Sequence, residues 1–302
     1  MPLMQPPVTS TASQEHGRLR SLWRRVVCRP ITHVMIVVSV VWTAILLTAP
    51  DDKWRALGVS NGFDVFNGDY WSLFTSNFAH ANLVHLFFNV YWLAILGGYT
   101  EEHFGRRFYS LLIVICTFCS SALELSFSGE TGIGLSGVIY GIFGFLWGTK
   151  IFGKQQPSVI DAKTIQLFVV WLFVCIALSA SGAMPIGNVA HVSGLIVGLL
   201  TALLCFKQLL VVKCSLPAII ILSAATLFYS PWSEPWLGSR AFRADCNGNY
   251  PLAEEYYSRL LNRDPDDAWA LENRASVREE LHKTQEAQQD KQRAEQLRSK
   301  KK

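Results

Sequence analysis

Long apolar runs separated by short polar segments occupy most of this chain. A helix of about 20 apolar residues crosses the core of a bilayer. Six runs approach or reach that length, and we expect each to be a membrane-spanning helix: 31–49, 82–100, 108–127, 137–152, 165–180 and 189–206. A seventh run, 216–229, is shorter and contains Pro217. From it we predict a seventh transmembrane helix within residues 208–232.

The polar ends of the chain complete the predicted organisation, which is that of an all-α polytopic membrane protein. Residues 1–30 form an N-terminal segment, 31–207 a six-helix core, 208–232 the seventh span and 233–302 a soluble helical tail. The first apolar run has the position of a signal sequence, but it is long and lacks a clean small-residue cleavage site. We therefore expect it to be retained as a helix.

The tail carries the spacing of one tetratricopeptide repeat. The matching positions are Gly248, Tyr250, Ala253, Tyr257 and Pro265. A second helix pair after them is a much weaker match. Because stable arrays need about three repeats, we expect the tail to pack on something else, as a helical hairpin that binds a protein partner or the membrane core. The alternative is a plain helical tail, and residues 285–302 are polar enough to be a solvated helix or disordered.

The composition favours a membrane protein over a soluble one. Half of the residues are hydrophobic and only 17% are charged, whereas a soluble domain carries about 25% charged residues. The net charge of +4 is small, and we expect no nucleic-acid partner. The seven cysteines are scattered, mostly within apolar runs, and form no recognisable disulfide or zinc framework. We expect neither a metal nor a cofactor.

Basic residues on the short loops predict the orientation, because Lys and Arg stay on the cytoplasmic side of a membrane. They are concentrated before the first span and on every second loop after it: Arg18, Arg20, Arg24, Arg25, Arg29, Arg106, Arg107, Lys150, Lys154, Lys163, Lys207 and Lys213. The N-terminus is therefore predicted to be cytoplasmic, with the tail and Ser136 toward the outer face. A bacterial inner membrane is the favoured location, and an organelle-targeted protein is the alternative.

Two polar residues within the apolar runs have the chemistry of a nucleophile and a base. Ser136 lies between glycines at the start of the fourth run, and His191 lies in the sixth. A serine hydroxyl needs a neighbouring base to accept its proton, and imidazole titrates near neutral pH. Glycines at helical spacing would let the two helices approach closely: Gly137, Gly141, Gly144, Gly148, Gly194 and Gly198. The alternative is that these glycines serve only helix association and the polar pair only a structural hydrogen bond.

A third group of polar residues leads into the second span. His85 and Asn89 are one helical turn apart and therefore share a face. Both can donate a hydrogen bond, as can the backbone N–H of Ser136, and such donors stabilise the oxyanion formed in acyl transfer. Tyr140, one turn after the serine, is placed to stack on the ring of the base. No carboxylate is positioned for that task, and we predict Glu124 to be an interfacial residue.

These motifs, in this order, resemble the rhomboid family of intramembrane serine proteases. The resemblance covers roughly residues 30–207 and rests on His85-x-x-x-Asn89, Gly134-x-Ser136-Gly137-x-x-Tyr140-Gly141 and Ala190-His191-x-x-Gly194-x-x-x-Gly198, together with His80, Tyr70-Trp71, Gly97-Gly98 and Glu101. The chain departs from the family at Ser72, where Arg often follows the tryptophan. We expect loop anchoring or substrate handling to differ there. The seventh span and the tail lie outside the resemblance.

The resemblance implies a six-helix core in which Ser136 is the nucleophile and His191 the general base. It also implies that loop 50–81 lies against the outer leaflet. The other implied site residues bind the oxyanion or the substrate, or support the dyad: His85, Asn89, Gly134, Tyr140 and His80.

The predicted function is that of an intramembrane serine endopeptidase. It would cleave single-span membrane proteins within the lipid bilayer, near its outer face, through an acyl-enzyme. The alternative is a non-catalytic relative that binds membrane clients, and the complete Ser–His pair favours the enzyme over it. A transporter would require inverted repeats and charged residues at the midplane, and the sequence shows neither.

Overall fold

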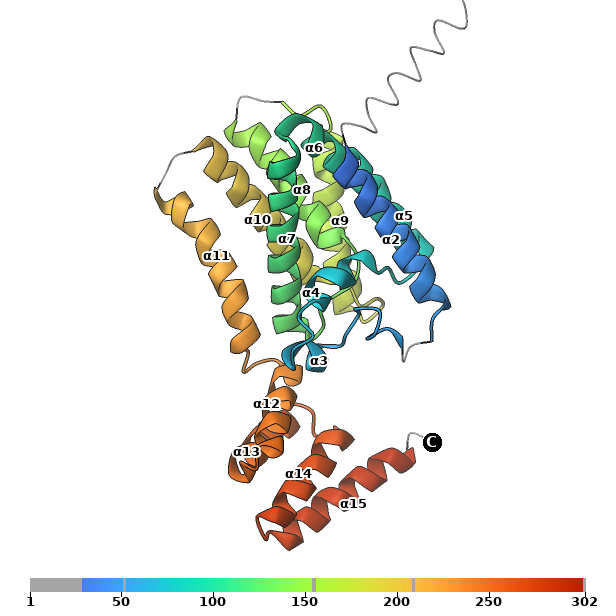
Figure 1. The fold of residues 1–302 in the computed structure, drawn as a ribbon, viewed down its shortest axis with the longest axis vertical. Coiled ribbons are helices and arrows are strands. Elements are labelled where there is room, and N and C mark those ends of the chain that lie inside the picture. Colours follow the sequence, from blue (N-terminus) through green and yellow to red (C-terminus); the bar gives the residue numbers. More distant parts are fainter. Residues whose placement is uncertain (1–28, 51–52, 154–155, 208–209, 301–302) are drawn as a thin grey trace, which may run out of the picture.

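The computed structural model describes residues 29–50, 53–153, 156–207 and 210–300, and its regular elements are helices (Figure 1). No strand occurs among these residues. The prediction of an all-α polytopic membrane protein is confirmed. Nearly all of the predicted N-terminal segment, including Arg18, Arg20, Arg24 and Arg25, lies outside the described residues.

All seven predicted apolar runs are helical. They correspond to α2 (Pro30–Thr48), α5 (Leu83–Trp92) continued by the π-helical turn η3 (Leu93–Gly97) and α6 (Gly98–Phe104), α7 (Arg106–Ser128), α8 (Ser136–Phe152), α9 (Ala162–Ala180), α10 (Asn188–Phe206) and α11 (Leu210–Phe228). In the described part of the chain, five stretches are long and apolar enough to cross a membrane, while α8 and the Lys213–Phe228 part of α11 are shorter apolar segments. The short fourth helix is the most enclosed of them, because α7 and α10 pack against it.

Helices α8 and α10 approach each other backbone to backbone. A Cβ atom added to Gly194 would lie 2.1 Å from the Gly137 carbonyl oxygen, and one added to Gly198 would lie 1.9 Å from that of Gly141. Any side chain at these positions would force the helices apart. Small residues of this kind allow membrane helices to associate through van der Waals contact, since lipid gives no hydrophobic drive between them.

The loop after α2 folds into three short helical turns at one end of the bundle (Figure 1). These are α3 (Gly62–Phe66), α4 (Ser72–Thr75) and η2 (Ser76–Phe78). Ser72 stands at the position where the resemblance leads one to expect an arginine. It is fully buried, and its hydroxyl accepts a hydrogen bond from the Ser60 N–H at 3.2 Å, which stabilises the loop. A long arginine side chain would not fit that enclosed position.

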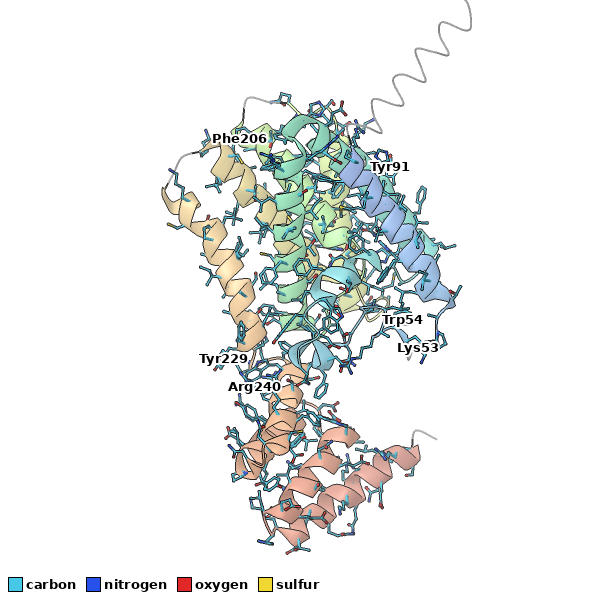
Figure 2. All side chains as sticks on the ribbon, viewed as in Figure 1. Lys53, Trp54, Tyr91, Phe206, Tyr229 and Arg240 are labelled. Carbon is cyan, nitrogen blue, oxygen red and sulfur yellow. The ribbon has the colours of Figure 1, made fainter. Side chains whose placement is uncertain are left out.

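The tail consists of four helices in two hairpins: α12 (Glu234–Cys246), α13 (Tyr250–Leu261), α14 (Ala268–Glu280) and α15 (Thr284–Lys300). Figure 2 shows Tyr229 and Arg240 at its junction with the bundle, at the same end as Lys53 and Trp54 of the loop and away from Phe206. The expectation of a solvated or disordered end is wrong for one face of α15. Ala287, Asp290 and Ala294 of that face are buried against the rest of the tail.

A network of ion pairs joins α14 to α15 and, through Glu254 of α13, connects the two hairpins. The Asp290 carboxylate accepts hydrogen bonds from Arg274 at 2.7 and 2.8 Å and from Arg278 at 2.7 Å. Glu254 accepts from Arg278 at 3.0 Å and from Lys283 at 2.6 Å. Burial alone would raise the pKa of Glu254, but these two cations outweigh it and hold the pKa below its usual value. The resulting stability is present at neutral pH and is lost as the pH falls through that lowered pKa.

We expect Asp290→Ala to destabilise the tail by roughly 2 kcal/mol. That cost is below the range for a fully buried pair because both arginines keep other partners. The matched control is Glu279→Ala, whose exposed pair with Lys291 should contribute less than about 1 kcal/mol. Limited proteolysis of the purified full chain at rising temperature measures both. Equal melting of the two variants would show that the buried Asp290 pairs add no more to the stability of the tail than the exposed pair does.

Candidate active site

Ser136 is the first residue of α8 and follows a turn at residues 129–135. Two features fix that turn near the serine. The Gly134 N–H donates to the Ser76 carbonyl oxygen at 3.2 Å. Gly134 itself has φ of +99°, and a Cβ atom there would lie 2.6 Å from Cε1 of His85. Only glycine satisfies both the backbone angle and this contact. The turn therefore brings the predicted residue His85 close to the serine backbone.

The structure brings Ser136 and His191 together across the α8–α10 contact. His191 Nε2 lies 2.8 Å from Ser136 Oγ, which is hydrogen-bonding distance. The imidazole is 4% exposed. With its proton on Nδ1, a neutral imidazole can accept the serine proton at Nε2. Nδ1 has no hydrogen-bond partner among the described residues, so no carboxylate from these residues orients this ring.

An aromatic ring supports the imidazole instead. Tyr140 stacks on His191 with ring centroids 4.7 Å apart and an interplanar angle of 28°. The Tyr140 hydroxyl donates to the Phe168 carbonyl oxygen at 3.1 Å, which ties the ring to α9. This is the stacking predicted from the one-turn spacing. The contact restricts the tilt of the imidazole without adding a charge in the bilayer.

His80 and His85 lie side by side at the start of α5. Their ring centroids are 5.0 Å apart, with an interplanar angle of 68°. His80 Nδ1 lies 3.1 Å from the Thr43 hydroxyl, so α2 anchors this ring. The His80 ring also contacts the Gly134 position, where a Cβ atom would lie 3.5 Å from its Cδ2. Both imidazoles therefore gather around the backbone just before Ser136.

Asn89 lies one turn after His85 on α5, as predicted. Its Nδ2 donates to the His85 carbonyl oxygen at 2.9 Å. Its Oδ1 is buried and has no partner among the described residues. The observed amide thus bonds to its own helix, and a rotation of the side chain would be needed for Nδ2 to face an oxyanion.

Glu124 is the residue that our sequence analysis misjudged. We predicted an interfacial side chain, but Glu124 is only 4% exposed, and its Oε2 accepts a hydrogen bond from the Ala190 N–H at 2.7 Å. It thereby caps the N-terminus of α10, one residue before His191, where a negative charge is favourable. The sequence shows a carboxylate at the end of an apolar run but contains no signal that links it to residue 190.

The arrangement contains the groups that acyl transfer requires. A hydroxyl nucleophile faces an imidazole base, and the rings of His80 and His85 lie beside the backbone at Gly134. No cluster of three or more metal-ligating side chains is found in the described ranges. The site sits at the end of α8 that faces the loop and the tail (Figure 1).

Comparisons with known proteins point to one family. Residues 67–208 match the rhomboid domain family. The chain is 31% identical over 175 residues to a protein of Salmonella paratyphi A named rhomboid protease GlpG, a match covering 57% of this chain and 62% of that protein. It is 36% identical over 136 residues to the protein of the same name from Photorhabdus laumondii, covering 45% and 47%. The chain thus spans about half to three fifths of the length of these relatives.

We expect Glu124→Ala to slow the reaction of Ser136 with a fluorophosphonate probe by about tenfold, because the uncapped start of α10 would shift His191. Glu124→Gln keeps a carbonyl acceptor for the Ala190 N–H and should retain most of the rate. Labelling rates of the purified variants measure this difference. A wild-type rate in Glu124→Ala would show that the cap does not position the imidazole.

Proposed function

Because the chain carries a rhomboid domain at residues 67–208, we propose that it is an intramembrane serine endopeptidase. The observation that supports this most directly is the 2.8 Å contact between Ser136 Oγ and His191 Nε2. Ser193 of α10 provides the contrast, because its hydroxyl donates to the Val189 carbonyl oxygen of its own helix. Ser136 instead directs its hydroxyl at a base.

In the proposed reaction Ser136 attacks the carbonyl carbon of a peptide bond. His191 accepts the hydroxyl proton and then donates it to the leaving amine, which leaves an acyl-enzyme. His191 next takes a proton from water, the water attacks the ester, and the proton returns to the serine oxygen as it leaves. The Ser136 N–H, His85 and Asn89, after rotation of its amide, are the proposed donors to the oxyanion.

The proposed substrates are proteins with a single transmembrane helix. Peptide bonds within a helix are shielded by their own hydrogen bonds and by neighbouring side chains, so the segment has to unwind before the serine can reach a carbonyl. Small residues near the cleavage site would make that unwinding easier, because they pack weakly and glycine disfavours the helix. The position of Ser136 at one end of α8 supports a cleavage site near one face of the bilayer.

The orientation is part of the proposal. The protein is a multi-pass membrane protein, and we propose the bacterial inner membrane, with a cytoplasmic N-terminus. Basic residues then lie at the cytoplasmic ends of the helices. The loop, the turn before Ser136 and the tail share the opposite end of the bundle (Figure 1) and would face outward.

Replacing Ser136 or His191 by alanine should abolish cleavage of a model single-span substrate, by at least about a thousandfold, while the protein still folds. Ser193→Ala is the matched control because that serine lies two residues after His191 on α10 but bonds within its own helix. Gel-based cleavage of a purified substrate in detergent, with probe labelling of the same samples, measures the loss. Retained cleavage in purified Ser136→Ala would refute the assignment.

Cys246 at the end of α12 is exposed and provides a test of orientation. It should react with a membrane-impermeant thiol reagent added to intact spheroplasts, since the tail is proposed to face outward. Cys246→Ser, labelled in parallel, identifies the signal. Labelling that appears only after lysis would place the tail, and with it the Ser136 end of the bundle, in the cytoplasm.

A further inference from the structure

The tail is packed against the part of the protein that positions the nucleophile. Its first helix, α12, lies on α3 of the loop (Figure 1). One continuous hydrophobic cluster joins residues of the loop, the end of α7 and the tail: Val65, Phe66, Leu73, Leu125, Trp236, Leu237 and Ala241. Residues 62–66 and the whole tail lie outside the part of the chain that matches the rhomboid domain. Their contact is therefore a feature of this chain beyond that domain.

Specific contacts fix the position of α3 against the tail. The ring of Phe63 packs edge-on against Phe242, with centroids 5.8 Å apart, and against Trp269, with centroids 5.4 Å apart. The Arg243 guanidinium donates to the Phe66 carbonyl oxygen and, through Nε, to Asn67 Oδ1 at 3.1 Å. An α-helix of five residues has little stability of its own. The placement of α3 therefore depends on these partners.

The same loop and tail hold both ends of the turn that leads to Ser136. At its start, the Gly129 carbonyl oxygen is pressed against Gly62 of α3, where a Cβ atom would come within 1.8 Å. The Pro235 ring of α12 covers the other side, 3.2 Å from where a Gly129 Cβ would be. At its far end, the Gly134 N–H is bonded to Ser76 of the same loop. The turn is thus held between the loop and the tail.

The junction with α11 fixes the tail itself. The Phe228 carbonyl oxygen, at the end of α11, accepts hydrogen bonds from Trp236 Nε1 and from Arg240 Nη2, both at 3.1 Å. The Trp232 indole N–H donates to Ser126 Oγ of α7 at 3.1 Å. The tail therefore has one defined position relative to the bundle, and α3 is held against that fixed surface.

We propose that the tail is a positioning element for the nucleophile, and that the positioning residues at its contact with the loop are Phe63 of α3 and Arg243 and Pro235 of α12. They touch neither Ser136 nor His191. They act by holding α3 and Gly129, which set the path of the turn into α8. This inference rests on the proposed protease function for its kinetic consequences, but its structural claim can be tested without activity.

The test compares Phe63→Ala and Arg243→Ala in the full-length protein. The matched control is Arg259→Ala, an arginine of α13 that contacts Glu255 and Tyr256 within the tail. We expect the probe-labelling rate of Ser136 and kcat for a single-span substrate to fall together by about tenfold in both variants, with KM unchanged, because a misplaced nucleophile affects the reacting geometry. The double variant should lose less than the product of the single losses, since both break one contact. Arg243→Lys replaces Arg243→Ala if the latter does not fold.

Other outcomes would overturn the proposal. A faster reaction in the variants would make the tail an inhibitory cover. A raised KM with an unchanged labelling rate would make it a substrate receptor. Unchanged kinetics would make it a passive appendage.

Hydrogen exchange of the 129–135 segment separates this inference from the proposed activity. It is measured in a Ser136→Ala background, where no turnover occurs. Exchange should become faster when Phe63→Ala is added and stay unchanged when Arg259→Ala is added. Suppose that the wild-type protein neither labels nor cleaves. Faster exchange in the Phe63→Ala variant would still support the proposal that the tail holds the turn before Ser136, and unchanged exchange would refute it.

Discussion

The backbone contact between α8 and α10 is the constraint on which the rest of the structure depends. Ser136 and His191 lie on different helices and are 55 residues apart in the chain. Their side chains meet because glycines at Gly137, Gly194 and Gly198 allow the two backbones to touch. In a bilayer this contact is stabilised mainly by van der Waals forces, which decline steeply with distance. One methyl group in the seam would therefore separate the dyad as well as loosen the bundle.

Two buried carboxylates accept hydrogen bonds from backbone N–H groups at the starts of helices, which would otherwise have no partner within the helix. Glu101 accepts hydrogen bonds from the Ile31 and Thr32 N–H groups at 2.9 and 2.8 Å and caps α2, while Glu124 caps α10. Unsatisfied backbone groups are costly in lipid, and a negative charge at a helix N-terminus is favourable. Each carboxylate ties together two helices that are distant in sequence. In the case of Glu124, the helix so fixed carries the imidazole base.

The polar end of the bundle combines short elements that cannot hold themselves in place. Helices α3 and α4 have five and four residues, and the turn before Ser136 contains several glycines. Helix α3 and the start of the turn are held by contact with α12, and α4 packs against α7. The short elements beside the nucleophile therefore depend on the longer helices packed around them.

The sequence by itself determined the helical class, the seven apolar helices and the identity of the paired serine and histidine. Those features follow from local composition and spacing, which the chain carries directly. The stacking of Tyr140 on His191 was also predictable, because the serine and the tyrosine are one helical turn apart. Only the tertiary structure decided the position of Glu124, the internal hydrogen bond of Ser72 and the seating of Phe63 against the tail. Each of these depends on which surfaces meet after folding, and contacts between residues far apart in the chain leave no periodic signal in a single sequence.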